Sequence, residues 1–188
     1  MVFPVVKYGD PILRKKGVRV TEFTSELQEY IGNLFETMYQ ARGVGLASQQ
    51  VGQALQICVI DVRGMKDRPS QLWLSGQEAE VDAFMPLALI NPVIKPRGVP
   101  LAGPEGCLSF PEIYAEVVRP SEVDVTALNQ RGESFEFRSG GLLARAVQHE
   151  VDHLNGILFI DRMDAENLGD VKAEIDSLMA KTRQQLKG

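Results

Sequence analysis

Hydrophobic positions recur at helical spacing in three stretches of the chain. The first opens at Ser25–Gln28, which reads as a capping box, and ends at Arg42-Gly43. The second covers residues 140–154 and ends at Asn155-Gly156, a pair suited to a left-handed helix C-cap. The third covers residues 165–187. The pattern predicts an N-terminal helix, a central helix and an amphipathic C-terminal helix.

Shorter apolar segments rich in β-branched residues predict strands. They cover residues 55–62, 88–94, 114–118, 122–128 and 133–138, with a turn at 129–132. Residues 64–83 are polar and weakly patterned, so we expect a hairpin packed on the surface, with a lid anchored by Trp73 and Leu74 as the alternative. PRGVPLAGP (96–104) is expected to be a turn-rich loop.

These elements predict an α+β fold, with antiparallel β-sheets around the central helix and a further helix near each end of the chain. No internal repeat and no linker divides the sequence, so we expect residues 1–188 to form a single catalytic domain.

Composition narrows the class of protein. Hydrophobic residues make up 44% and charged residues 24% of the chain, as in ordinary globular proteins. The net charge of -5, without a basic stripe, argues against a nucleic-acid surface. No apolar run approaches the roughly 20 residues that cross a bilayer, so no membrane partner is expected. The N-terminus lacks a secretory pattern, and Cys58 and Cys107 are too few for a disulfide framework, so we expect a reduced, cytoplasmic protein.

Both histidines of the chain lie in QHEVDHLNG, where His149 and His153 flank Glu150. Helical residues four apart have Cβ atoms roughly 5–6 Å apart, so the two imidazoles can converge on one ion. Glu150 can then reach a water on that ion without being a ligand. This His-Glu-x-x-His pattern is typical of metallohydrolases, and a chance match on an exposed helix face is the alternative.

Several residues could provide the third ligand. Phe159 stands where the metzincin pattern needs a histidine, which excludes that class. Glu166 or Glu174 could serve, as in thermolysin-like enzymes, although both lie in the amphipathic tail. Cys107 is the better candidate, because a thiolate binds Zn²⁺ or Fe²⁺ strongly. A small buried hydrophobe is the alternative for Cys107, and the residues alone leave this choice open.

Three motifs, GVGLASQQVG, EGCLS and QHEVDHL, occur in the order and at about the separations of the signature motifs of the peptide deformylases. The chain resembles this family from Gly9 to Met163. The resemblance implies a hydrolase that removes the formyl group from N-formylmethionyl peptides, the nascent chains, and releases formate. It also implies a bacterial cytoplasmic enzyme, with the mature form of an organellar protein as the alternative.

The resemblance implies that Cys107, His149 and His153 bind one divalent metal ion, with water as the fourth ligand. Fe²⁺ is the ion expected in the cell, and Zn²⁺, Ni²⁺ or Co²⁺ could replace it in a purified sample.

The resemblance also assigns catalytic roles. Glu150 would be the general base, and Gln50 and the backbone N–H of Leu108 would donate to the developing oxyanion. The positions implied to contact substrate are Gly43, Val44, Gly45, Glu105, Gly106, Leu142, Arg145 and Ala146.

Each of these matches has a simpler alternative. Gly43 could merely stop a helix, and Val44, Leu142 and Ala146 could be ordinary core residues rather than a methionine pocket. Glu105 and Arg119 resemble an ion pair that braces the cysteine loop, and an exposed pair of little consequence is the alternative.

Other positions depart from the family pattern or have uncertain roles. Gln49 stands where proline is common, which predicts a less rigid loop. Arg145 stands where the family usually has an apolar residue. We expect it to extend past the rim of the pocket, and a charge offered to the peptide is the alternative. Asp152 is expected to be exposed or to support the ligands.

In some relatives the C-terminal region docks to the ribosome. The basic residues there are Lys172, Lys181, Arg183 and Lys187. A solvated helix is the simpler interpretation.

Two other functions remain to be separated from a deformylase. A metalloprotease with a glutamate third ligand predicts that Cys107→Ser keeps metal and activity. A non-catalytic binding module with a structural metal site would not need Glu150 or Gln50, so the presence of both residues argues against it.

Overall fold

The fold is built on one sheet whose strands follow the order β1-β2-β5-β6-β7-β3-β4, with every neighbouring pair antiparallel. The computed structural model describes residues 1–188. The strands are β1 (Gly45–Ala47), β2 (Ile57–Ile60), β3 (Ser70–Leu74), β4 (Gln77–Glu78), β5 (Leu87–Cys107), β6 (Phe110–Leu128) and β7 (Ser134–Gly140).

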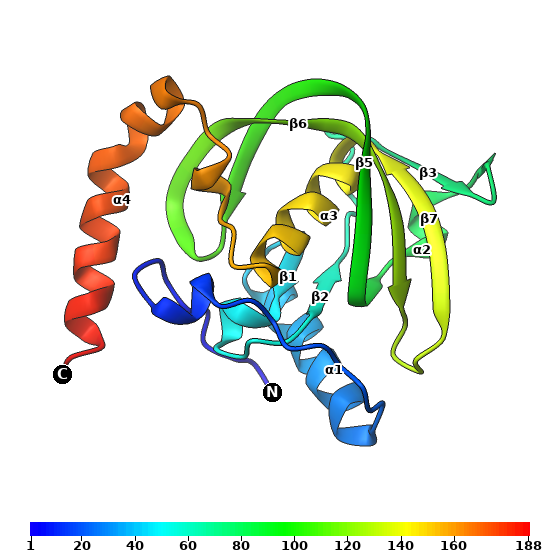
Figure 1. Ribbon diagram of the computed structural model, residues 1–188, viewed down its shortest axis with the longest axis horizontal. Coiled ribbons are helices and arrows are strands. Elements are labelled where there is room, and N and C mark those ends of the chain that lie inside the picture. Colours follow the sequence, from blue (N-terminus) through cyan, green and yellow to red (C-terminus); the bar gives the residue numbers. More distant parts are fainter.

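The helices surround and fill this sheet. They are α1 (Ser25–Gln40), α2 (Val81–Phe84), α3 (Gly141–Leu154) and α4 (Ala165–Gln185), with short 3-10 turns η1 (Pro11–Arg14), η2 (Ser48–Val51) and η3 (Phe159–Asp161). Figure 1 shows β5 and β6 arching over α3, with α1 below and α4 standing at one side. The predicted α+β fold with a central helix is confirmed.

The three long helices were predicted, but one cap was placed one residue late. The side chain of Thr24, not Ser25, accepts a hydrogen bond from the Leu27 N–H at 3.3 Å and caps α1. Helix α1 ends as predicted near Arg42, whose φ of 55° is left-handed.

The prediction of a turn-rich loop at residues 96–104 was wrong. Strand β5 continues through this stretch and pairs with β6 as far as Cys107. Its prolines are tolerated because β2 pairs only with residues 87–90 of β5, so the outer part of β5 has one free edge. The two strands predicted at 114–118 and 122–128 are parts of one strand, β6.

Residues 64–83 contain the predicted hairpin, formed by β3 and β4. Strand β3 pairs with β7 and therefore extends the main sheet. Leu72 is fully buried, so the hairpin also contributes to the core. Trp73 does not line the cavity described below, so the structure gives it no place as a lid anchor.

Three clusters of buried side chains hold the layers together. The largest joins the sheet to α3, a second packs α1 against β1 and β2, and a third lies between β6, η3 and α4. No helix is long and apolar enough to cross a membrane. Both cysteines are free, and Cys58 is buried in β2 as its strand pattern predicts. The assignment of residues 1–188 to one domain stays a prediction.

Candidate metal centre

Helix α3 buries an unusual number of polar side chains. His149, Glu150 and His153 are 8%, 5% and 1% exposed. Burying polar groups is costly unless they are paired or bind an ion. The groups that these three side chains contact should therefore explain why they are buried.

Cys107, at the end of β5, faces the two histidines. The Cys107 Sγ lies 3.3 Å from His153 Nε2, and one donor atom from each of Cys107, His149 and His153 lies within 4.8 Å of the others. One sulfur and two imidazole nitrogens at this spacing fit a single divalent cation. Glu166 and Glu174 are exposed on α4 and do not belong to this group, so the geometry favours Cys107 over the alternative of a glutamate third ligand.

The two histidine rings are held in different protonation states. Burial, with the nearby His149 and Arg119, lowers the pKa of His153 well below its usual range, which keeps this ring neutral. His149 Nδ1 lies 2.9 Å from Glu105 Oε2. Because an ionised carboxylate only accepts hydrogen bonds, Nδ1 carries a proton. Burial lowers the pKa of His149, but its bonds to Cys107 and Glu105 outweigh this and raise that pKa well above its usual range, so a cation at Nε2 would displace a proton there.

Glu105 is itself held by a buried ion pair. Burial alone would raise its pKa, but its bonds to His149 and Arg119 lower that pKa to about 2. Glu105 and Arg119 are 5% and 4% exposed, so the alternative of an exposed pair was wrong. Arg119 also donates to Asp152 Oδ2 at 2.8 Å, and Arg162 donates to Asp152 Oδ1 at 2.8 Å. Asp152 is buried and supports Arg119, so of its two expected roles the structure favours support of the ligands over exposure.

Glu150 is the buried carboxyl that has no such partner. Its Oε2 makes no hydrogen bond, and burial raises its pKa to about 7, although the nearby His149 acts in the opposite direction. The space for this carboxyl comes from Gly45 on β1. A Cβ at Gly45 would lie 2.8 Å from the Glu150 carboxyl carbon.

Gln50, in η2, points its amide nitrogen toward the cysteine. Gln50 Oε1 accepts from the Ala47 N–H at 2.9 Å, which orients the amide so that Nε2 approaches Ser109 Oγ at 3.3 Å and Cys107 Sγ at 3.5 Å. The neighbouring Gln49 is fully buried and donates to the carbonyls of Lys15 and Leu154. These contacts argue against a less rigid loop at Gln49, which stays an untested prediction.

The N-terminal segment joins the two loops, which sequence reasoning missed. The Val6 N–H donates to the Gln50 carbonyl at 2.8 Å and the Tyr8 N–H to the Ser109 carbonyl at 2.9 Å. Between them, Lys7 Nζ donates to the Leu108 carbonyl at 2.8 Å. The only signal in the sequence was a lysine set among apolar residues in FPVVKY.

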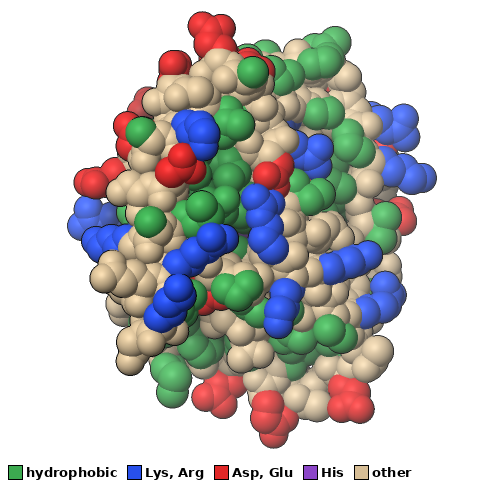
Figure 2. Space-filling model, turned by 60° about the vertical axis from the view of Figure 1, so that its left-hand side comes forward, with side chains coloured by type: hydrophobic (Ala, Val, Ile, Leu, Met, Phe, Trp, Pro, Cys, Tyr) green, Lys and Arg blue, Asp and Glu red, His purple; other side chains and the backbone are tan.

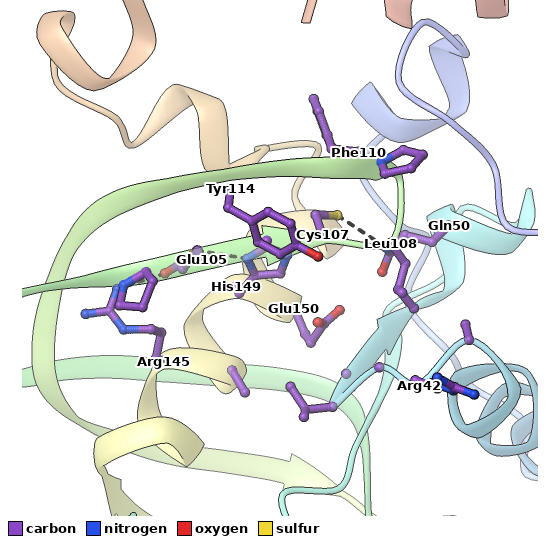
Figure 3. Close-up of a pocket in the computed structure, with 18 of the residues that line it drawn as sticks. Arg42, Gln50, Glu105, Cys107, Leu108, Phe110, Tyr114, Arg145, His149 and Glu150 are labelled. Carbon is purple, nitrogen blue, oxygen red and sulfur yellow. Dashed lines mark hydrogen bonds and ion pairs between the residues drawn. The ribbon is translucent and has the colours of Figure 1, made fainter. Parts of the chain in front are cut away.

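A cavity of about 520 Å³ brings the predicted residues together (Figure 3). Its lining includes all the positions implied for substrate and catalysis: Gly43, Val44, Gly45, Gln50, Glu105, Gly106, Cys107, Leu108, Leu142, Arg145, Ala146, His149 and Glu150. His153 lies behind this lining, beside Cys107. The lining also has members that the sequence did not single out, among them Lys7, Arg42, Met65, Arg68, Phe110 and Tyr114.

Arg145 lines the cavity but does not extend past its rim. Its side chain is only 11% exposed, and its guanidinium binds Glu105 and two backbone carbonyls. The rim interpretation was wrong, because β5 and β6 arch over this part of α3 and offer acceptors there.

The comparisons with known proteins agree with this site. The family model described as "Polypeptide deformylase" matches residues 2–168. Peptide deformylases from Opitutus terrae and Methylacidiphilum infernorum are 40% and 43% identical, over 100% and 95% of this chain and 98% and 93% of theirs. The crystal structure of peptide deformylase 1B from Arabidopsis thaliana in complex with an inhibitor is similar with a TM-score of 0.83, at 37% identity over 97% of this chain and 93% of that one. The chain therefore belongs to the polypeptide deformylase family, the metal-dependent hydrolases that remove the N-formyl group from newly made polypeptides.

Proposed function

We propose that Cys107, His149 and His153 hold one divalent metal ion, Fe²⁺ in the cell, at which this chain deformylates formylmethionyl peptides. The observation that carries the proposal is the set of three donor atoms within 4.8 Å of one another beside a buried, unpartnered carboxyl. A thiolate with two imidazoles also suits Zn²⁺, Ni²⁺ and Co²⁺, which can replace Fe²⁺ in a purified sample.

Glu150 moves the proton in this proposal. A bound cation supplies the Lewis acidity that makes water a strong nucleophile near neutral pH. Glu150 takes a proton from the attacking water and passes it to the amine as the C–N bond breaks. Burial raises its pKa to about 7 in the metal-free chain, and a nearby cation lowers that value. The carboxyl can therefore both accept and release a proton near neutral pH.

Gln50 and Leu108 stabilise the oxygen on which negative charge develops. Gln50 and Leu108 both line the cavity beside Cys107, and the Gln50 Nε2 and the Leu108 backbone N–H are the donors in this proposal. Donors placed in this way contribute about 2.7–4 kcal/mol each in comparable enzymes. Because the Ala47 N–H fixes Gln50 Oε1, the donor side of the amide is oriented before substrate arrives.

The substrate enters as an extra strand beside β1. This strand is the first in the sheet order, so one of its edges is open to an extended peptide along Gly43, Val44 and Gly45. Leu142 and Ala146 line the cavity below and, with Val44, form the pocket for the methionine side chain. On the opposite side the peptide passes Glu105 and Gly106. A formyl carbon bears only hydrogen, so the narrow space at the metal excludes bulkier acyl groups.

Two further proposals concern the cell. We place the enzyme in the cytoplasm of a bacterium, and the mature form of an organellar protein is the alternative. Ribosome docking through the basic residues of the C-terminal segment stays an untested alternative to a solvated helix. Cosedimentation of the chain with ribosomes, lost when Lys181, Arg183 and Lys187 are replaced by glutamine, would support it.

One experiment tests the metal site and the reaction together. The chain is purified without oxygen, its metal content is measured, and formate release from a formyl-Met tripeptide is followed. Cys107→Ser is expected to lose both metal and activity, and Glu150→Gln is expected to keep metal and lose activity. Glu174→Gln is the matched control for the alternative ligand and should match the wild type. A Cys107→Ser protein that keeps metal and wild-type activity would contradict the proposal.

A further inference from the structure

Arg145 is tied to three acceptors on the two strands that arch over α3. Its Nη1 donates to Glu105 Oε1 at 3.0 Å and to the Val117 carbonyl at 2.8 Å, and its Nη2 donates to the Leu101 carbonyl at 2.8 Å. Leu101 and Glu105 belong to β5 and Val117 to β6. A planar guanidinium presents five donors in a fixed fork, so it can meet acceptors on two strands at once.

The backbone opposite Arg145 leaves room for this group. A Cβ at Gly103 would lie 2.9 Å from Arg145 Nη2 and 3.1 Å from its Cζ. Any other residue at position 103 would therefore push the guanidinium away from its acceptors. Gly103 of β5 therefore faces the Arg145 guanidinium of α3, and its missing side chain leaves the space that this group occupies (Figure 3 shows Arg145 on the side of Glu105).

The contacts of Arg145 lead to a metal ligand in one further step. Glu105 Oε1 accepts hydrogen bonds from Arg145 and Arg119. Glu105 Oε2 accepts a second hydrogen bond from Arg119 and contacts His149 Nδ1. Both carboxylate oxygens are thus fixed. A carboxylate that holds the second nitrogen of a ligand histidine sets the orientation and proton position of that ring.

Arg119 and Arg145 fix Glu105 from different parts of the fold. Arg119 comes from β6 and also binds Asp152. Arg145 comes from α3, four residues before His149, so it lies about one helical turn from the ligand on the same face. Arg145 therefore ties the position of Glu105 to the helix that carries His149.

We propose that Arg145 is a positioning residue for the metal centre, which sets the His149 ring through Glu105 by fastening α3 to both strands of the β5–β6 hairpin. The inference rests on the proposed role of His149 as a ligand. It assigns Arg145 no contact with substrate; both Nη1 hydrogens and one Nη2 hydrogen are donated to the protein itself. Loss of the guanidinium then leaves Glu105 with one arginine and a freer His149 ring.

The test replaces Arg145 by methionine, which keeps the length of the side chain and removes the donors. The readouts are the rate at which Zn²⁺ passes from the protein to a chelator, and kcat and KM separately for a formyl-Met tripeptide. We expect Zn²⁺ to dissociate about 10- to 100-fold faster and kcat to fall, with KM within about twofold of the wild type. A changed KM or a changed peptide preference would show a substrate contact instead. An unchanged dissociation rate with a lower unfolding midpoint would show a purely structural role, and either result would overturn the proposal.

Gly103→Ala gives an independent approach to the same contact. Its methyl group displaces the guanidinium, so this variant is expected to lose Zn²⁺ faster than the wild type. Because both changes break one interaction, Gly103→Ala should add little in the Arg145→Met background. Fully additive effects on the dissociation rate would contradict the inference.

Arg97→Met is the matched control for the hairpin. Arg97 links β5 to Asp124 of β6 at 2.7 Å but does not reach the site, so its loss should leave the Zn²⁺ dissociation rate unchanged.

The proposed function and the proposed role of Arg145 are contradicted by different results. A wild-type chain that neither holds metal nor releases formate would overturn the proposed function. A wild type that does both and is matched by Arg145→Met would overturn this inference alone.

Discussion

Glu150 is an ionisable residue placed where a charge is unfavourable. It is 5% exposed, its Oε2 has no partner, and burial raises its pKa to about 7. A carboxyl optimised for stability would be paired, as Glu105 is with Arg119. The site therefore maintains a destabilising group, which is the expected trade-off where a residue must exchange protons.

This trade-off predicts a pH-dependent stability of the metal-free chain. The pKa of Glu150 rises from about 4.3 in the unfolded state to about 7 in the folded one. Between these values the folded chain holds a proton that the unfolded chain has released, so stability falls as the pH rises and levels off above about 7. Glu150→Gln removes this dependence, whose full size is on the order of 4 kcal/mol.

Urea denaturation of chelator-treated wild type and Glu150→Gln from pH 4.5 to 8 measures the difference. The free-energy gap between the two proteins should shift in favour of Glu150→Gln as the pH rises. A gap that stays constant across this range would mean that Glu150 is ionised in the folded chain at low pH. Glu174→Gln, an exposed change on α4, should show a flat gap.

Gly45 is required by the volume of the neighbouring carboxyl, and not by its own backbone angles. In Gly45→Ala the new methyl group would meet the Glu150 carboxyl carbon at 2.8 Å and displace it. A displacement of this kind can cost about a hundredfold in rate, so we expect kcat/KM to fall by about that factor with metal content unchanged. Gly169→Ala is the control, because nothing lies near its Cβ. Wild-type kcat/KM in Gly45→Ala would show that Glu150 need not stand where the structure has it.

Sequence reasoning located the site residues unevenly, for physical reasons. His149, Glu150 and His153 could be placed together because helical geometry fixes residues that are close in sequence. Cys107 is 46 residues from His153, and only the register of β5 against β6 brings it there. The role of Arg145 could not be predicted, since one of its acceptors, the Leu101 carbonyl, lies in a stretch that was expected to be a loop.

At the scale of elements, the long hairpin β5–β6 was the part least visible in the sequence. Pro96, Pro100 and Pro104 are typical of turns, and they led to the prediction of a loop. In the structure they lie in the part of β5 that pairs with β6 alone. The helices were easier to predict, because an apolar stripe of several turns is a local pattern. What the sequence could not indicate was which strand edges would be free.

Helix α4 contributes to stability without contributing to the cavity. Ile175 is 5% exposed and packs in the cluster with Phe110 and Phe159, and no residue of α4 lines the cavity. Ile175→Ala should lower the free energy of unfolding by about 2–4 kcal/mol. Its kcat/KM at 25 °C should match the wild type.

Denaturant unfolding and a formate assay on the same preparation test this separation. Leu186→Ala, at an exposed position of the same segment, should change stability by no more than about 0.5 kcal/mol. A large loss of kcat/KM in folded Ile175→Ala would mean that α4 influences the site through the Phe110 and Phe159 cluster.

At the scale of the whole molecule, charge is unevenly distributed. The chain has a net charge of -5, yet Figure 2 shows a face where Lys and Arg side chains gather across the middle and most Asp and Glu side chains lie toward the edges. The lining of the cavity contains Lys7, Arg42 and Arg68, whereas Glu112 is its only exposed acid. A substrate therefore meets a positive entrance on an acidic protein.

Arg42 and Arg68 should favour peptides with acidic residues after the formylmethionine. Arg42 is exposed at the end of α1, and Arg68 donates to the Pro104 carbonyl on the facing strand. One exposed charge pair in water contributes about 1 kcal/mol or less, so kcat/KM for formyl-Met-Asp-Ala should exceed that for formyl-Met-Lys-Ala by roughly three- to sixfold at low salt. Arg42→Gln with Arg68→Gln should remove the preference, and 0.5 M NaCl should weaken it in the wild type because salt screens exposed charges. Arg131→Gln, in the turn between β6 and β7 and outside the lining, should leave the preference unchanged. An acidic preference that survives both substitutions and high salt would place its origin in a contact buried from solvent and not in the charge of the entrance.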